Sequence, residues 1–153
     1  MNFSINRDLL LDNLIIMQRG LPLRTSLPIL TTIKFDVKED HIVLTSSNTD
    51  IAIQILIDDE DLSIGKSGVL TIPGKFLIDI IRKATSERIE FNLIEDRIVV
   101  VKSNRSEFKL RLMDPTDYPD IDFLDNNQEP LVIDADLLKT IIKETSYAVA
   151  TSE

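Results

Sequence analysis

One strand-and-helix phrase occurs three times in this chain of 153 residues, and the repetition constrains the fold more than any other feature. The copies are Phe3–Met17, Leu70–Ala84 and Leu131–Thr145, at offsets of 67 (70 − 3) and 61 (131 − 70) residues. Each copy begins as a short strand with alternating apolar residues, breaks, and continues with apolar residues at helical spacing. Such self-similarity indicates that one structural unit is used repeatedly. The repeat therefore constrains the architecture more strongly than any single motif.

The aligned copies share apolar positions and predict matching elements. In register, the shared positions are Ile5 with Ile72 and Ile133, Leu9 with Phe76 and Leu137, Leu10 with Leu77 and Leu138, and Leu14 with Ile81 and Ile142. The middle copy predicts a helix over 75–84 whose apolar stripe is Phe76, Leu77, Ile80, Ile81 and Ala84. Its other side carries Lys75, Asp79, Arg82 and Lys83. Such a face is typical of a solvated helix and also suits a polyanionic partner.

The repeat extends beyond the helix, because three strands are predicted after each of the first two copies. The first unit is a strand at 3–5, a helix at 7–19 with Asn6 as its N-cap, and strands at 28–37, 42–47 and 51–57. The second unit is a strand at 69–72, the helix, and strands at 88–94, 97–103 and 106–112. This order predicts an α+β fold of two repeated strand–helix–three-strand units, with both helices on one face of the sheet.

The segment Asp114–Pro130 is rich in Asp and Pro, lacks periodicity, and is predicted to connect two domains. We expect a first domain at 1–127 and the start of a second at 128–153. That start consists of a strand at 131–133 and a helix with Asp134 as its N-cap.

The formal net charge of −9 argues at first against a nucleic-acid partner, but the acidic residues are concentrated in two stretches. Without 58–61 and 114–129, 26 − 10 = 16 acidic residues remain against 17 basic ones, so the helix faces are free to be positive. The chain has no Cys and one His, His41, which excludes thiolate sites and His clusters. It has no long apolar run. We expect a cytoplasmic protein without a catalytic site, metal or cofactor.

Two local motifs do not reach the pattern that their chemistry requires. Gly65-Lys66-Ser67 is similar to a phosphate-binding loop, but Glu60 stands where the first glycine is needed. The run Asp117, Asp120, Asp122 and Asp125 lacks the spacing, the glycine and the terminal glutamate of a calcium loop. A solvated linker is the favoured interpretation of this run.

Together with the repeats, four segments resemble the bacterial DNA polymerase III beta subunit, the sliding-clamp family. They are LRTSLPIL (23–30), IPGKFLIDIIRK (72–83), SNRSEFKLRLMDPTDYPDI (103–121) and ETSYAVATSE (144–153). The resemblance covers the whole chain, from the first domain into the start of the second. It implies a clamp fold in which three such domains form one chain and two chains close a ring around duplex DNA. Helices then line the hole, and no active site is expected.

The resemblance also implies which residues act. Arg24 matches a family position that contacts DNA, and helix position makes Arg7, Arg19, Arg82 and Lys83 candidates for lining the hole. The ring interface of the family matches Lys75, Arg105, Phe108 and Leu110. Arg24 is otherwise interpreted as a solvent-facing loop residue, and Phe108 and Leu110 as core. The implied partners are double-stranded DNA without sequence preference, the replicative polymerase, a clamp loader and a second copy in the ring.

Length is the departure from the family, because the partner-peptide pocket and the opposing ring face belong to later domains. Two alternatives therefore stay open. One is a regulatory or scaffolding module that reuses the clamp domain without encircling DNA. The other is an enzyme that uses carboxylates of 114–125, such as Asp120 and Asp122.

Overall fold

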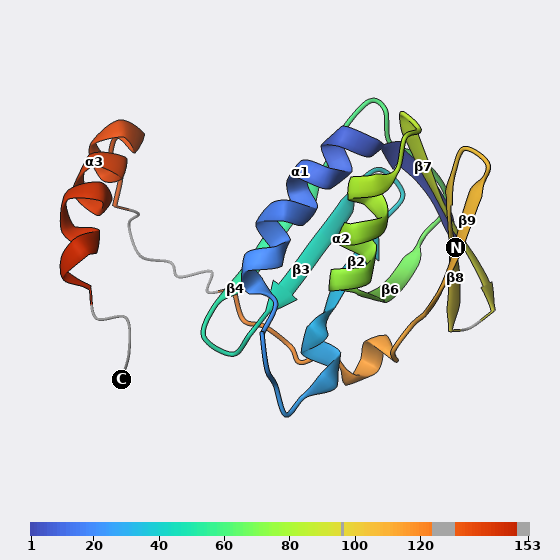
Figure 1. Ribbon diagram of the computed structural model, residues 1–153, viewed down its shortest axis with the longest axis horizontal. Helices are drawn as coiled ribbons and strands as arrows, with labels where there is room; N and C mark the ends of the chain where they lie inside the picture. Colours follow the sequence, from blue (N-terminus) through green and yellow to red (C-terminus); the bar gives the residue numbers. More distant parts are fainter. Residues whose placement is uncertain (96, 124–130, 150–153) are drawn as a thin grey trace. The chain divides into compact units, whose positions relative to one another are not determined.

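The computed structural model describes residues 1–95, 97–123 and 131–149 (Figure 1). The chain divides into two compact units, Met1–Ile121 and Asp122–Glu153. The predicted boundary between residues 127 and 128 lies outside the described residues. No helix in the described ranges has the length and apolar content needed to cross a membrane.

The strands of the first unit form two antiparallel sheets, ordered β5-β1-β7-β8-β9 and β4-β3-β2-β6. Their bounds are Asn2–Asn6 (β1), Thr32–Val37 (β2), Ile42–Ser47 (β3), Ala52–Ile57 (β4), Ser63–Lys66 (β5), Gly68–Pro73 (β6), Arg88–Glu95 (β7), Ile98–Ser103 (β8) and Ser106–Arg111 (β9). The two repeats exchange their first strands. Strand β1 of the first repeat pairs with β7 of the second, and β6 of the second pairs with β2 of the first. Neither sheet is therefore built from one repeat alone.

Helices α1 (Arg7–Met17) and α2 (Gly74–Lys83) lie side by side on the same face, as the repeat predicts (Figure 1). They run antiparallel, because the start of α1 contacts the end of α2. The predicted N-cap Asn6 is confirmed, since its Oδ1 accepts from the backbone N–H of Asp8 (2.9 Å) and Leu9 (3.1 Å).

The core contains the apolar positions shared by the first two copies. Ile5 and Ile72 are both fully buried, as are Leu10 with Leu77 and Leu14 with Ile81. Phe3 stacks on Phe91 at 4.5 Å between ring centroids, and Phe35 lies about equally far from both rings, at 6.3 and 6.1 Å. These rings come from β1, β7 and β2, so the exchanged strands meet in one core.

The predicted apolar stripe of α2 includes one exposed residue, Phe76, and omits one buried residue, Ile78. The buried residues are Gly74, Leu77, Ile78 and Ile81, whereas Phe76 is 65% exposed. Leu77 is flanked by Phe76 and Ile78, each 100° away around the helix, so both were possible members of the stripe. Packing against β2 and β6 places Ile78 inside and leaves Phe76 outside.

Three segments differ from the predicted strands and connector. Pro28–Thr31 forms a 3-10 turn, η2, so the predicted strand at 28–37 begins only at Thr32. Strand β5 is absent from the prediction because its four residues, SIGK, show no clear alternation. The start of the predicted connector packs on the first unit, since Tyr118 is buried against Ile29 and Leu30.

The second unit contains α3 (Ala135–Thr145), whose first turn is capped by Asp134 as predicted. Residues 131–133 do not form the predicted strand. A strand needs a neighbour to satisfy its backbone, and the residues described around this segment include none. The stripe Leu137, Leu138, Ile141 and Ile142 is 41–56% exposed.

Candidate nucleic-acid interface

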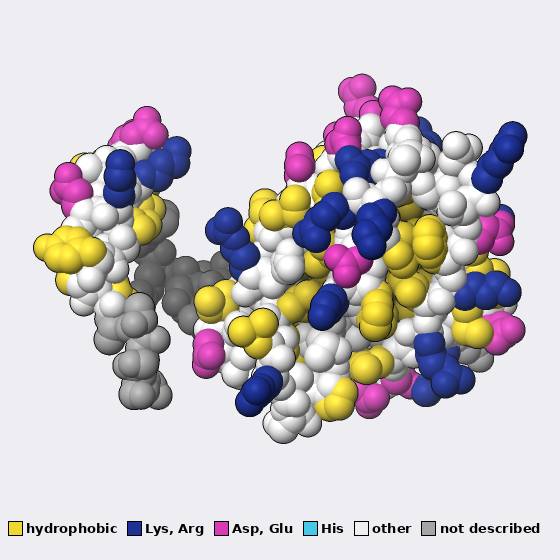
Figure 2. Space-filling model, viewed as in Figure 1, with side chains coloured by type: hydrophobic (Ala, Val, Ile, Leu, Met, Phe, Trp, Pro, Cys, Tyr) yellow, Lys and Arg dark blue, Asp and Glu magenta, His cyan; other side chains and the backbone are white. Residues whose placement is uncertain are grey.

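The outward face of α2 is basic. Lys75, Arg82 and Lys83 are exposed because they lie opposite the buried stripe of the helix. Figure 2 shows Lys and Arg side chains gathered where Figure 1 places α2. Arg82 has an acidic neighbour, Asp79, at 3.5 Å, and both side chains are half exposed. An exposed pair of this kind is weak, so the last turn of α2 keeps its positive character.

The outward face of α1 differs from that of α2. Its exposed residues include Asp8, Asp12, Ile15 and Ile16, and no Lys or Arg occurs between Arg7 and Arg19. The basic character of the helix layer therefore comes from α2 and from the two ends of α1.

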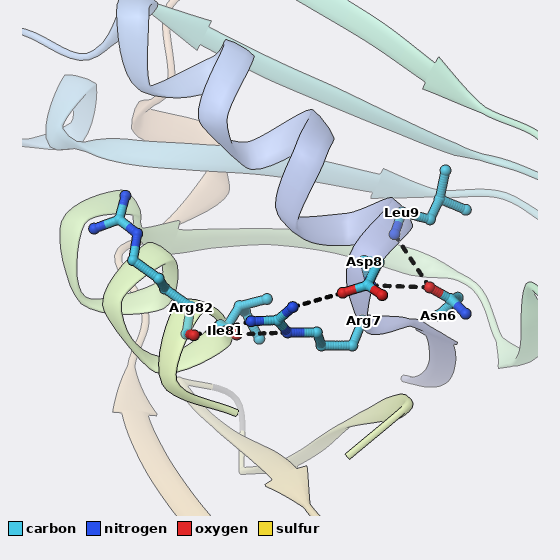
Figure 3. A network of polar contacts seen from close by, with 6 residues as sticks. All are labelled: Asn6, Arg7, Asp8, Leu9, Ile81 and Arg82. Carbon is cyan, nitrogen blue, oxygen red and sulfur yellow. Dashed lines mark hydrogen bonds and ion pairs between the residues drawn. The ribbon is translucent and has the colours of Figure 1, made fainter. Parts of the chain in front are cut away.

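Arg7 is occupied by contacts within the protein (Figure 3). Its Nε donates to the carbonyl oxygen of Ile81 (3.1 Å), and its Nη2 donates to that of Arg82 (2.9 Å). Its Nη1 pairs with Asp8 Oδ1 at 2.5 Å. The side chain is 23% exposed, so Arg7 joins the start of α1 to the end of α2 instead of standing free over the helices.

Arg19 and Arg24 are both exposed, and they lie at the other end of the helix pair. Arg19 belongs to the 3-10 turn η1 (Gln18–Gly20) that follows α1. Arg24 lies in the loop to η2, which begins against α2. A Cβ on Gly74 would come within 2.4 Å of Leu21 Cδ1, so this glycine lets the loop approach the helix closely. The loop therefore begins beside the start of α2 and continues to the exposed Arg24.

Three of the four residues predicted at the ring interface, Arg105, Phe108 and Leu110, lie on or next to β9 at an outer edge of the five-stranded sheet, whereas Lys75 lies in the first turn of α2. Strand β9 is the last in its order, so one side of its backbone has no strand partner among the described residues. Phe108 is 37% exposed, Leu110 is partly buried, and Arg105 is exposed. Such an edge suits pairing with another chain.

A hollow of about 170 Å³ adjoins this edge, between the end of α2 and the turn from β8 to β9. Its lining includes Ile80, Lys83, Arg105 and Phe108. The structure thus brings Arg105 and Phe108 together but leaves Lys75 outside the lining, at the opposite end of α2. Sequence reasoning missed Ile80 here because it assigned that residue to the buried stripe.

Strand β9 is tied to its neighbour by an ion pair between Lys102 Nζ and Glu107 Oε1 at 2.7 Å. The hydrogen bond to Glu107 raises the pKa of Lys102, and the same bond lowers the pKa of Glu107. Both shifts favour the charged forms of the two side chains.

The acidic run after β9 shows no arrangement for metal-assisted chemistry in the part of the chain that the structure describes. No group of three or more metal-ligating side chains occurs among the described residues, and Asp125 and Glu129 lie outside them. Asp114 accepts from the backbone N–H (3.0 Å) and hydroxyl (2.6 Å) of Thr116, which lowers the pKa of its carboxyl group. This carboxylate caps the 3-10 turn at 115–117.

Comparison with known proteins gives consistent matches. Residues 1–122 match the family described as the DNA polymerase III beta subunit, N-terminal domain. The chain is 35% identical to the beta sliding clamp of Staphylococcus epidermidis, over the whole chain and 42% of that relative. The DNA polymerase III beta chain of Streptococcus pneumoniae superposes with a TM-score of 0.92 at 32% identity, over 99% of this chain and 41% of that one.

The DNA polymerase sliding clamp of Bacillus subtilis also superposes with a TM-score of 0.92, at 29% identity, over 100% of this chain and 41% of that one. The chain thus spans about two fifths of the length of the curated relatives that it matches.

Proposed function

The chain belongs to the family of the DNA polymerase III beta subunit, and we propose that it supplies the N-terminal domain of a DNA sliding clamp. In this proposal a longer protein closes a ring around duplex DNA and tethers the replicative polymerase. Two observations support it: the family match, and the basic face that α2 presents beside α1. The ring acts in the bacterial cytoplasm, where a clamp loader opens and closes it.

The chemistry required of this domain is modest. A topological tether needs only weak contacts, and Lys or Arg bound to phosphate oxygens provide them without reading bases. Arg24, Arg19, Arg82 and Lys83 are exposed and serve as the phosphate contacts. Arg7 was also predicted as such a contact, but its three side-chain interactions favour a supporting part. The domain performs no catalysis and binds no cofactor, and the polymerase carries out nucleotide transfer.

The ring closes at the β9 edge. Phe108 and Leu110 provide partly exposed apolar surface, while Lys75 and Arg105 supply positive charge for an acidic opposing face. The opposing face lies in a later domain of a second copy.

Retention on circular DNA tests this function. The protein encoded by the complete reading frame is loaded on a nicked circular plasmid with its clamp loader and ATP, then washed with high salt. We expect it to remain on the circle and to leave when a restriction enzyme linearises the plasmid. Equal loss from circular and linear DNA would show that the association is not topological.

A non-encircling regulatory or scaffolding module is the second candidate, and the outward face of α1 favours it. Asp8, Asp12, Ile15 and Ile16 suit a protein surface better than a phosphate backbone. The same plasmid experiment separates the candidates, because a scaffold gives no difference between circular and linear DNA.

A further inference from the structure

Helix α2 ends without the glycine that commonly closes a helix. Ala84 follows the last helical residue in an extended conformation (φ −64°, ψ 138°), and its N–H donates to the carbonyl oxygens of Ile80 (2.9 Å) and Ile81 (3.3 Å). The last four carbonyls of a helix lack ordinary intrahelical partners. The end of α2 therefore depends on donors from elsewhere in the protein.

Arg7 supplies those donors from the first turn of the neighbouring helix. Its guanidinium binds the carbonyls of Ile81 and Arg82, and its backbone N–H donates to the carbonyl of Glu87 (2.8 Å). One residue thus holds both the last turn of α2 and the segment that follows it. A cation at this position also interacts favourably with the negative end of the helix dipole.

Arg7 is itself held in place. Asp8 pairs with the Nη1 of its guanidinium, and the Asn6 cap fixes the first turn of α1 (Figure 3). The guanidinium fork presents its donors in a fixed plane, so it reaches two carbonyls at once, which a lysine ammonium on a flexible stem does not reproduce.

The turn that Arg7 holds carries Arg82 and Lys83, two of the proposed phosphate contacts. We propose that Arg7 is a positioning residue: it fixes the last turn of α2 so that Arg82 and Lys83 face the duplex, and it does not contact phosphate itself. The inference rests on the proposed DNA contact of this domain. It reassigns a residue that helix position alone placed among the DNA contacts.

Duplex binding by the 153-residue chain, measured over a range of salt concentrations, tests this role. The probe is a labelled duplex of mixed sequence, read by fluorescence anisotropy at a temperature where melting curves show every variant folded. The variants are Arg7→Lys, Arg7→Gln, and the pair Arg82→Gln/Lys83→Gln with and without Arg7→Lys. Arg97→Lys is the matched control, because Arg97 is an exposed arginine outside the helices and the substitution also preserves net charge.

Positioning predicts a loss of salt dependence without a loss of charge. The salt slope is the slope of log K for duplex binding against the logarithm of the salt concentration. The variant Arg82→Gln/Lys83→Gln should lower its magnitude by about 2, one for each phosphate contact. Arg7→Lys should lower the slope by about 1 to 2 although the net charge is unchanged, and it should have no further effect in the paired variant. The salt slope of Arg7→Gln should equal that of Arg7→Lys. The salt slope of Arg97→Lys should equal that of the unaltered chain.

Other outcomes overturn the inference in distinguishable ways. If Arg7 contacts phosphate directly, Arg7→Lys keeps the slope and Arg7→Gln lowers it by about 1 in both backgrounds. If Arg7 only stabilises the fold, the melting temperature falls and the slope stays unchanged for both substitutions. If the unaltered chain does not bind duplex, or the paired variant binds equally well, the proposed DNA contact itself fails, and the positioning role fails with it.

Discussion

Truncation of Phe108 to alanine separates an interface residue from a core residue. The side chain is 37% exposed, so about 63% (100 − 37) of it is covered within the first unit. A fully buried Phe→Ala change costs about 3–5 kcal/mol, and scaling by the covered fraction gives roughly 2–3 kcal/mol for Phe108→Ala. The remaining exposed surface is available to a partner.

Two measurements on matched variants test this division. Urea unfolding of the 153-residue chain, followed by circular dichroism, should show a midpoint lowered by about 1 M, given a slope of about 1–3 kcal/mol/M. Val101→Ala is the control, because Val101 lies opposite Phe108 on β8 and is fully buried. Val101→Ala should lower the free energy of unfolding by a similar amount, roughly 1.5–3 kcal/mol. Sedimentation of the protein from the complete reading frame should then show a weakened dimer for Phe108→Ala alone.

Two results would refute the reasoning. If Phe108→Ala and Val101→Ala weaken dimerisation equally, the effect comes from general destabilisation and the β9 edge is not the contact. If Phe108→Ala leaves dimerisation unchanged while lowering the urea midpoint, Phe108 is a core residue only.

Three further predictions concern single positions. Arg24→Ala should lower the salt slope of duplex binding by about 1, equally for unrelated sequences, in a titration over salt, and an unchanged slope and affinity would make it a plain loop residue. Phe76→Ala should change the free energy of unfolding by less than about 1 kcal/mol, whereas Ile78→Ala should cost about 2–5 kcal/mol; urea melts giving the reverse order would restore the stripe predicted from sequence. Burial raises the pKa of Tyr118 to about 12, so its phenol stays protonated in the fold but ionises near pH 10 when unfolded. This pKa difference should contribute about 2–3 kcal/mol to the free energy of unfolding, a contribution that is fully present below about pH 10 and lost as the pH rises through about 12. In thermal melts across this range the melting temperature should fall as the Tyr118 contribution is lost. Tyr118→Phe cannot ionise at this position, so its melting temperature should lack that part of the fall.

Local features of the sequence predicted much of the fold correctly. Asn6 and Asp134 were expected as N-caps, and both bind the amides of the following turn. Capping depends on a few neighbouring residues, so it can be read without the tertiary structure. The aligned pairs Ile5 with Ile72 and Leu14 with Ile81 are buried, because each repeat presents the same apolar face.

Other features required partners that lie far apart in the sequence. Two repeats of one pattern are compatible with two separate sheets or with exchanged strands, and the pairings of β1 with β7 and β6 with β2 establish the exchange. Phe76 and Ile78 are both apolar and flank the same stripe, so only the direction of the sheet distinguishes them. The short strand β5 forms because β1 offers it an edge.

The sequence by itself determined the repeat, the helix starts and the family, because these depend on patterns within short segments of the chain. Only the tertiary structure decided what each basic residue on the helices does. Arg7 and Arg82 looked equivalent as cations on adjacent helices. In the fold, the antiparallel packing of α1 and α2 brings Arg7 against the open carbonyls of α2 and leaves the Arg82 side chain exposed. The physical reason is that backbone carbonyls at a helix end need hydrogen-bond donors. Which donor reaches them depends on contacts between residues more than 70 positions apart in the sequence.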